Sequence, residues 1–172
     1  MQNHTCNTGC CNIIIKPYKI NNVNYVYNTH SYKKAGVVIY NPKENKVLLI
    51  QSRGQLWGPP KGTMENNETY IQCAIREVKE ETGLDIKAEN LKYSTCIKNH
   101  SVYYYMETDK LNGDIQETEG NDANGIAWIK LSCLNNCIEN GVLSLNKHCI
   151  IIFNRFFNKL FQTSDFIKIK KK

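Results

Sequence analysis

The chain has 172 residues, with 22 Lys and Arg against 16 Asp and Glu, which gives a formal net charge of +6. This length suits one domain with short extensions at either end. No apolar run approaches the roughly 18 residues of a membrane span, and the polar start at residues 1–11 lacks the charged-then-apolar layout of a secretory signal. The sequence therefore predicts an intracellular, cytoplasmic protein whose positive charge favours acidic substrates.

The eight cysteines have two interpretations. The first is reduced thiols, because disulfides are rare inside cells. The second is structural zinc, since candidate ligands gather in two places: His4, Cys6, Cys10 and Cys11, and further on Cys133 and Cys137. Neither group has the paired C-x-x-C spacing of common zinc sites, so reduced thiols are the favoured interpretation.

The chain is predicted to begin with an irregular, Asn-rich extension at residues 1–30, in which Val23–Tyr27 is a candidate strand. Val37–Tyr40 and Val47–Gln51 are then predicted as strands, because apolar and β-branched residues flank the turn signals at residues 41–45. The folded domain is therefore expected to start after the extension.

Three glycines and two prolines make residues 54–62 a predicted loop. A helix is expected next at Thr69–Thr82, and Gly83 is expected to end it, since glycine readily adopts the left-handed conformation of a helix C-terminus. Apolar residues at helical spacing supply the expected buried stripe: Ile71, Ala74, Ile75 and Val78.

Further strands are predicted at Tyr93–Ile97, Val102–Thr108 and Ile126–Ile129, with a turn at Asn112-Gly113. The run Tyr103–Tyr105 puts aromatic side chains on both faces of its strand.

A final amphipathic helix is expected at Lys147–Phe161, capped by Ser144 or Asn146, before a basic tail at residues 166–172. Because only two predicted helices separate the strands, the pattern favours an α+β fold with a mixed sheet packed between helices.

Three glutamates of the predicted central helix, Glu77, Glu80 and Glu81, share one face, because positions i, i+3 and i+4 are neighbours on a helix. Like charges so placed repel one another and destabilise a bare helix. A divalent cation such as Mg²⁺ offsets this repulsion, since it binds carboxylate and phosphate oxygens together. Alone, the three residues would equally suit a solvated acidic helix face.

These glutamates stand within a longer pattern. Gly62 is followed after five residues by Glu68, and after seven more by Arg76-Glu77-Val78-Lys79-Glu80-Glu81-Thr82-Gly83-Leu84. The pattern resembles the signature of the Nudix hydrolases and matches it at every fixed position. Seven such identities would occur by chance at roughly 10⁻⁸ per starting position.

The resemblance implies a Nudix-type α/β/α sandwich with a central mixed β-sheet, in a domain at residues 31–165 between the extension and the tail. It further implies that Glu77, Glu80 and Glu81 bind Mg²⁺ or Mn²⁺, with Glu77 and Glu81 also acting in catalysis. Gly62 would let the backbone approach the metal, and Glu68 and Arg76 would form a bracing ion pair.

Such enzymes often use one more carboxylate, from a loop a few residues before a tryptophan-containing strand, which here carries Trp128. The best-aligned acid is Asp122, with Glu119 and Glu117 as competitors. Each of the three is equally compatible with a solvated loop acid.

Before the signature stands Trp57-Gly58-Pro59-Pro60-Lys61-Gly62, where Lys61 is placed to touch a phosphate. Trp57 is a candidate to bind substrate, although a single tryptophan more often lies in the core. This segment is similar to the mRNA-decapping enzymes of eukaryotes and large DNA viruses, and also to the diadenosine polyphosphate hydrolases. We favour the decapping branch, whose products are a capped nucleoside diphosphate and 5′-monophosphate RNA. Its RNA partner suits basic charge and spare aromatics.

The alternative substrates are a dinucleoside polyphosphate or a diphosphoinositol polyphosphate. An alternative of another class is a non-catalytic RNA-binding module that uses the basic tail at Lys168 and Lys170–Lys172. The complete set of signature carboxylates favours the enzyme.

Overall fold

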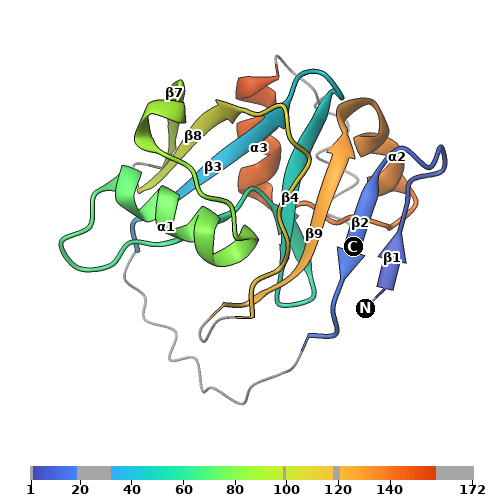
Figure 1. Ribbon diagram of the computed structural model, residues 1–172, viewed down its shortest axis with the longest axis horizontal. Helices are drawn as coiled ribbons and strands as arrows, with labels where there is room; N and C mark the ends of the chain where they lie inside the picture. Colours follow the sequence, from blue (N-terminus) through green and yellow to red (C-terminus); the bar gives the residue numbers. More distant parts are fainter. Residues whose placement is uncertain (1, 19–31, 99, 118–120, 158–172) are drawn as a thin grey trace.

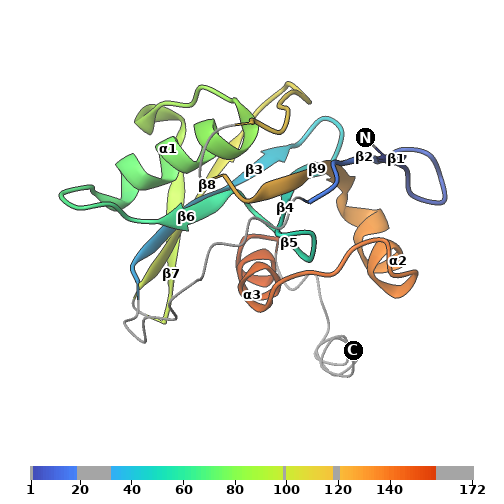
Figure 2. The ribbon, with the colours of Figure 1, turned by 90° about the horizontal axis from the view of Figure 1, so that it is seen from below.

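The structure is a computed structural model, and it describes residues 2–18, 32–98, 100–117 and 121–157. Within these residues a β-sheet forms the middle layer of the molecule, with helix α1 on one face and helices α2 and α3 on the other (Figure 1, Figure 2). The helices are α1 Tyr70–Thr82, α2 Leu134–Glu139 and α3 Lys147–Phe156. The predicted α+β sandwich is thus confirmed, with α2 as a helix that the sequence pattern missed.

The sheet is mixed. Its strands are β1 Gln2–His4, β2 Asn12–Ile15, β3 Lys34–Asn41, β4 Lys46–Ser52, β5 Leu56–Gly58, β6 Lys61–Thr63, β7 Tyr93–Ile97, β8 Ser101–Glu107 and β9 Ala123–Lys130. The order across the sheet is β1-β2-β9-β4-β3-β8-β7, with β5 beside β4 and β6 beside β3. Strands β3 and β8 run parallel and the other pairs antiparallel.

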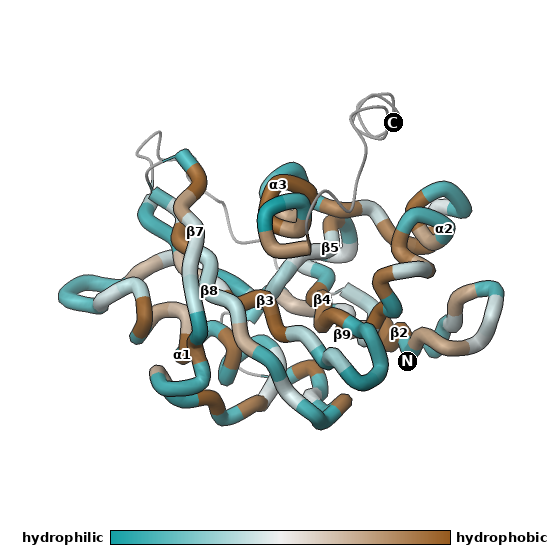
Figure 3. The backbone as a smooth tube through the Cα atoms, turned by 90° about the horizontal axis from the view of Figure 1, so that it is seen from above, coloured by the Kyte–Doolittle hydropathy of each residue, from teal (hydrophilic) through white to brown (hydrophobic). Residues whose placement is uncertain are grey.

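Alternate side chains of the central strands enter two separate cores. On β3, Val38 packs toward α2 and α3, whereas Val37 and Ile39 pack toward α1. The hydrophobic positions lie along β3 and β4, between the helices (Figure 3). Strand β8 confirms the predicted alternation of aromatics, since Tyr103 is buried in the first core and Tyr104 packs against the second.

Helix α1 begins and ends where the sequence predicts. Thr69 caps it, with its hydroxyl accepting the backbone N–H of Gln72, and Gly83 closes it at φ +72°. The predicted apolar stripe is wrong in part, because Ile71 is 39% exposed whereas Cys73 and Glu81 are buried. The helix is rotated so that its glutamate-bearing face, and not only its apolar stripe, lies toward the sheet.

The N-terminal segment is more regular than predicted. Residues 1–30 were expected to be irregular, but β1 and β2 form an antiparallel pair, and β2 also pairs with β9 from Asn12 against Trp128 to Ile15 against Gly125. Ile13 is fully buried by this pairing. The strands were missed because their partner strand lies more than a hundred residues later in the chain. The candidate strand Val23–Tyr27 lies outside the described residues.

Smaller differences concern loops and ends. The predicted loop at residues 54–62 contains the short strands β5 and β6. Helix α3 takes Asn146 as its cap, the second of the two predicted residues, while its expected end at Phe161 and the basic tail lie outside the described residues. None of the described helices is both long enough and apolar enough to span a bilayer.

Candidate active site

One pocket of about 1050 Å³ opens beside α1, between this helix and the segments that follow β4 and precede α3. Both carboxylates and cations line it. The acidic side chains in its lining are Glu65, Glu77, Glu80, Glu81 and Asp122. The basic ones are Lys34, Arg53, Lys61, Arg76, Lys98, His100, Lys147 and His148. The pocket therefore contains every signature residue that was predicted to bind metal.

Glu81 is the most deeply buried of these acids, with 5% of its surface exposed. Its Oε2 accepts the backbone N–H of Lys61 at 2.8 Å, so the helix holds the start of β6 through this carboxylate. Burial raises the pKa of Glu81 to about 8, although the charge and N–H of Lys61 act against this rise. A carboxylate this costly to ionise is stabilised by a cation placed beside it.

Glu77 lies one helical turn earlier, with 12% of its side chain exposed, and its carboxylate rests against the backbone of Gly62. A Cβ added at Gly62 would come within 2.0 Å of Glu77 Oε1. Burial also raises the pKa of Glu77, while the adjacent Arg76 opposes the rise. Glycine is therefore required at position 62 by close approach to a carboxylate.

Arg76 binds three signature glutamates at once. Its Nε and Nη2 pair with the two carboxylate oxygens of Glu68 at 2.9 and 3.0 Å, and its Nη1 contacts Glu77 at 2.9 Å and Glu80 at 3.0 Å. The hydrogen bonds from Arg76 hold the pKa of Glu68 below its ordinary value. The predicted pairing of Glu68 with Arg76 is thus present, and it ties the loop before α1 to the helix.

Three signature carboxylates, those of Glu68, Glu77 and Glu80, contact one guanidinium, and Glu81 lies one helical turn after Glu77. Lys61 adds a second positive charge that acts on Glu77 and Glu81. Negative charge therefore remains in excess on the pocket side of α1. Hard carboxylate oxygens at that density are the ligands that Mg²⁺ and Mn²⁺ take, so the residues present fit a divalent cation.

The three candidates for the downstream carboxylate are placed differently. Asp122 lines the pocket and pairs with Arg53, Oδ2 to Nε at 2.7 Å. Glu117 is 83% exposed, pairs with Lys16 at 3.2 Å and lies apart from the pocket lining. Glu119 lies outside the described residues. Of the two described candidates, the structure brings only Asp122 to the other carboxylates.

Four basic residues of the pocket lining, which we call the basic wall, come from segments that are far apart in the sequence. Lys34 starts β3, Lys98 follows β7, and Lys147 and His148 start α3. Burial, then the charge of Lys61, lowers the pKa of Lys34; burial, then the charge of Lys98, lowers the pKa of His148. These mutual effects show that the cations crowd together, which favours a bound polyanion.

Trp57, predicted to bind substrate, is instead part of the core. Only 1% of it is exposed, and it packs on the face of the sheet that α3 covers. Its backbone N–H donates to Ser144 at 2.8 Å and its carbonyl accepts from Asn146 at 3.0 Å. Trp57 therefore positions the start of α3, and through it Lys147 and His148, while its ring is not free to stack on a base. Lys61, the other predicted substrate residue, does line the pocket.

The sequence missed Arg53, Asn121 and the cations contributed by β3 and α3. Arg53 stands at φ +55° directly before Gly54, and this tight turn aims it at Asp122. Asn121 donates from Nδ2 to the backbone carbonyl of Glu80 at 2.9 Å, which ties the loop of Asp122 to the helix. The pair Arg53-Gly54 was a local signal for a tight turn. The contact of Asn121 and the placement of the cations depend on tertiary structure and have no local signal.

A model of the NUDIX domain family matches residues 31–141, which include the whole signature and every carboxylate in the pocket lining. The chain belongs to the Nudix hydrolase family. Members of this family hydrolyse pyrophosphate bonds and generally use a divalent metal. The chain is therefore an enzyme of this reaction class.

The chain is similar to relatives with different names. Protein 111R of Invertebrate iridescent virus 3, a candidate hydrolase by its name, is 30% identical over 130 residues, or 74% of this chain and 77% of that protein. The m7GpppN-mRNA hydrolase of Saccharomyces cerevisiae is 42% identical over 60 residues, which are 32% of this chain and 6% of the yeast protein. Dihydroneopterin triphosphate diphosphatase of Escherichia coli is 42% identical over 62 residues, or 35% of this chain and 41% of that enzyme.

Solved structures support the same fold. The bifunctional NMN adenylyltransferase/ADP-ribose pyrophosphatase of Francisella tularensis, solved with AMP and a Mn ion, superposes with a TM-score of 0.57. The match covers 77% of this chain and 42% of that one at 18% identity, so it shows the fold alone.

Proposed function

We propose that this Nudix hydrolase cleaves the triphosphate bridge of the 5′ cap of mRNA and releases a capped nucleoside diphosphate and 5′-monophosphate RNA. The observation that carries the proposal is that one pocket is lined both by the glutamates of α1, which we call the acidic wall, and by cations from β3, the end of β7 and α3, which form the basic wall. A divalent cation and a polyphosphate both fit such a pocket, side by side.

In this proposal Glu77, Glu80 and Glu81 hold Mg²⁺ or Mn²⁺, with the backbone at Gly62 leaving room for Glu77. When bound, the cation neutralises charge on the phosphate oxygens and lowers the pKa of an attacking water. Arg76 and Glu68 keep the glutamates in place between turnovers. The four signature carboxylates thereby act as one preorganised unit.

Asp122 is the proposed base. It lines the same pocket as the glutamates and is oriented by Arg53, so it can accept a proton from the water that attacks phosphorus. The water oxygen forms the new bond to one phosphorus, and the bridging oxygen leaves with the other phosphate. Lys61, with Lys34, Lys147 and His148 opposite, would bind the remaining phosphate oxygens.

The cap is preferred over small substrates because of the 42% identity to the yeast m7GpppN-mRNA hydrolase over 60 residues. The second candidate is a small molecule such as a dinucleoside polyphosphate or a diphosphoinositol polyphosphate. One observation favours it: the identity to an E. coli enzyme of a small triphosphate is equally high. A non-catalytic RNA-binding module is disfavoured, because every signature carboxylate lines the pocket or braces its helix.

A substrate competition tests the proposal. Purified protein with Mg²⁺ or Mn²⁺ is offered cap-labelled RNA and a dinucleoside polyphosphate together, before and after addition of an uncapped RNA competitor. Release of labelled capped nucleoside diphosphate, inhibited by the competitor, is the expected result. Turnover of the small molecule alone would overturn decapping and leave the second candidate.

A matched pair of variants tests the catalytic assignment itself. Glu81→Gln should abolish hydrolysis of either substrate, because the residue lies at the centre of the acidic wall. Glu89→Gln, whose side chain is exposed and pairs only weakly with Lys87 at 3.7 Å, should leave hydrolysis unchanged. Equal activity of both variants would contradict the role of the acidic wall.

A further inference from the structure

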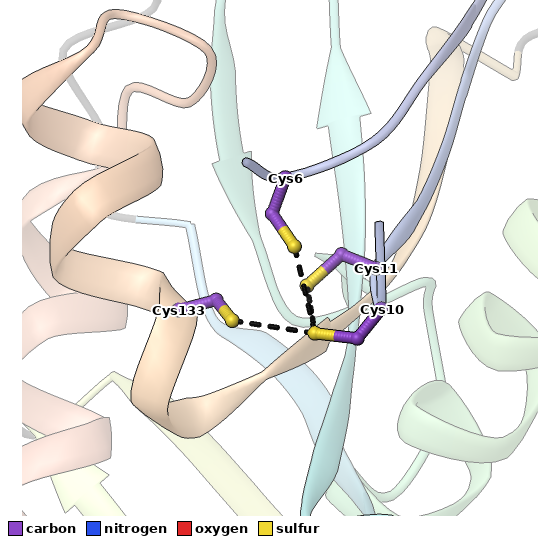
Figure 4. Close-up of side chains that lie close together, drawn as sticks. All are labelled: Cys6, Cys10, Cys11 and Cys133. Atoms are coloured by element: carbon purple, nitrogen blue, oxygen red, sulfur yellow. Dashed lines mark hydrogen bonds between the residues drawn. The ribbon is translucent and has the colours of Figure 1, made fainter. Parts of the chain in front are cut away.

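Four cysteine sulfurs meet where the loop between β1 and β2 approaches the turn before α2 (Figure 4). They belong to Cys6, Cys10, Cys11 and Cys133, and all four sulfurs lie within 4.8 Å of one another. Cys10 is central: its Sγ is 3.5 Å from that of Cys6, 3.9 Å from that of Cys11 and 3.4 Å from that of Cys133. None of the four belongs to the signature or lines the active-site pocket.

Two distant segments build this cluster. Cys6, Cys10 and Cys11 stand in the loop between β1 and β2, where a turn with Gly9 at φ +70° brings its N–H to the carbonyl of Cys6 at 2.9 Å. Cys133 ends a short 3₁₀ turn and directly precedes α2, 123 positions away from Cys10. The folded sheet, through the pairing of β2 with β9, brings the two segments together.

The geometry fits a tetrahedral thiolate site. Zinc binds cysteine sulfur at about 2.3 Å, so the four sulfurs of a tetrahedral site lie about 3.8 Å apart. The Sγ–Sγ distances of 3.4, 3.5 and 3.9 Å scatter around that value. The other Sγ–Sγ separations are no longer than 4.8 Å.

We propose that Cys6, Cys10, Cys11 and Cys133 bind one Zn²⁺ that fastens the N-terminal β1–β2 pair to the start of α2. All four coordination positions are filled by protein sulfur, which is the arrangement of a structural site and leaves no position for a substrate. Zinc is the metal of choice because soft thiolates disfavour Mg²⁺ and Mn²⁺, which the acidic wall of the active site would take.

Groups around the sulfurs suit thiolates. The Thr8 hydroxyl lies 3.2 Å from the sulfurs of both Cys6 and Cys10, and the backbone N–H of Lys130 donates to Cys11 Sγ at 3.3 Å. Such hydrogen bonds orient metal-bound sulfurs and offset part of their negative charge. Binding of zinc displaces the thiol protons to solvent, so charge and atoms balance without an oxidant.

The cluster selects among the candidate ligands that the sequence offered. Cys137 is buried in the hydrophobic core, and His4 is exposed on β1. Reduced thiols were favoured from the sequence because no C-x-x-C pair is present. The proposed ligands lack C-x-x-C spacing because three of them come from the loop between β1 and β2. The fourth, Cys133, is distant in the sequence and reaches them only in the folded protein.

The site would act on the catalytic pocket indirectly. The strand that it anchors, β2, ends near Lys16, whose carbonyl accepts from Asn124 Nδ2 at 3.2 Å and whose N–H donates to the Asn124 carbonyl at 2.7 Å. Asn124 Oδ1 in turn accepts the N–H of Gly54 at 2.7 Å, beside the Arg53 that orients Asp122. Zinc thus supports one wall of the pocket from the far end of β9.

Metal analysis of the full chain tests the proposal. Protein produced with added zinc and washed with a weak chelator should retain about one zinc per chain by plasma mass spectrometry. Cys10→Ser and Cys133→Ser should lose that zinc. Two controls should keep it: Cys96→Ser, an exposed cysteine on β7, and Glu81→Gln, which removes an oxygen ligand of the active site.

A second measurement keeps the test decisive if the serine variants fail to fold. Cobalt titrated into metal-free wild-type chain should produce the intense visible bands of tetrahedral cobalt–thiolate. Zinc should displace the cobalt and raise the melting temperature. Wild-type chain that contains no zinc and gives no thiolate band while its thiols are reduced would overturn the proposal. A metal-free Cys10–Cys133 disulfide, found by mass spectrometry of unreduced peptides, would also overturn it.

Discussion

The backbone of Gly62 lies so close to the carboxylate of Glu77 that a Cβ at position 62 would stand 2.0 Å from Glu77 Oε1. Gly62→Ala must therefore displace Glu77 from its place on the acidic wall. Because misplacing one group of a preorganised site is costly, we expect kcat/KM to fall about 10²-fold, with a change in melting temperature that is small beside it. Steady-state kinetics and thermal melts measure the two effects.

A double-mutant cycle separates this contact from general damage to β6. If Gly62→Ala acts by displacing Glu77, it should cost little further activity in a Glu77→Ala background, since the displaced group is already absent. Additive losses in the double variant would show instead that Gly62 acts independently of Glu77.

Glu81 makes the metal-free protein sensitive to pH. Its pKa rises from the ordinary 4.5 to about 8 on folding, so between these values the folded chain binds more protons than the unfolded chain. The contribution of Glu81 to stability is therefore most favourable below about pH 4.5 and declines as pH rises through 8. In chelator, Glu81→Gln should raise the melting temperature above that of the wild type at pH 8.5, and the gain should shrink toward pH 5.

Added Mg²⁺ or Mn²⁺ should reverse this order. A cation beside the carboxylates stabilises ionised Glu81, so it should raise the melting temperature of the wild type at pH 8.5 and have less effect on Glu81→Gln. Calorimetry in chelator and in metal provides both comparisons. A wild type whose melting is unaffected by either cation would contradict metal binding at the acidic wall.

The fork of Arg76 is expected to be essential for stability. Arg76 Nε and Nη2 each donate a hydrogen bond to one carboxylate oxygen of Glu68, which is largely buried. A lysine has no such planar pair of donors. Arg76→Lys should lower the free energy of unfolding by about 3 kcal/mol, because it leaves buried carboxylates without matched donors. Urea denaturation measures the change.

Lys79→Ala serves as the control for that variant. Lys79 is on the same helix and pairs with Asp85 at 2.8 Å, but both side chains are exposed. Exposed pairs contribute about 0.2–1 kcal/mol, so this change should be much smaller than that of Arg76→Lys. Equal effects would mean that the Glu68 fork adds no more than a surface pair.

Local patterns were sufficient for the central helix and the acidic wall. The stop at Gly83 and the convergence of Glu77, Glu80 and Glu81 each depend on residues within one or two helical turns, so spacing alone predicts them. Strands β3 and β4 were predicted to within a few residues of their observed ends, because their apolar runs and the turn between them are also local in the sequence. Family resemblance then supplied the sandwich around them.

Features that join distant segments were missed. Sequence alone leaves Trp57 open between the core and a substrate contact, because its burial depends on the chain at Ser144–Asn146 passing over β5. The β1–β2 pair needs β9 as its partner, and the cysteine cluster needs both. The basic wall likewise forms only when β3 and the start of α3 meet. No window of sequence contains both halves of any of these contacts.

The downstream base is expected to be Asp122 and not Glu117. Asp122 lines the pocket with the glutamates and is held by Arg53, whereas Glu117 pairs with Lys16 at an exposed site. Asp122→Asn should lower kcat by about 10²-fold, because the amide keeps the shape of the side chain but cannot accept a proton. Glu117→Gln should change kcat by less than about twofold, since surface substitutions away from a site have small effects.

The pH profile distinguishes a base from a residue that merely positions the loop. Loss of a base should remove the acidic limb of the kcat profile in Asp122→Asn, whereas loss of positioning would scale the whole profile down without changing its shape. Binding of Mn²⁺ to the acidic wall should stay within a few-fold of wild type in this variant. If Glu119→Gln, and not Asp122→Asn, removes the acidic limb, the base lies at Glu119 and Asp122 serves only to hold Arg53.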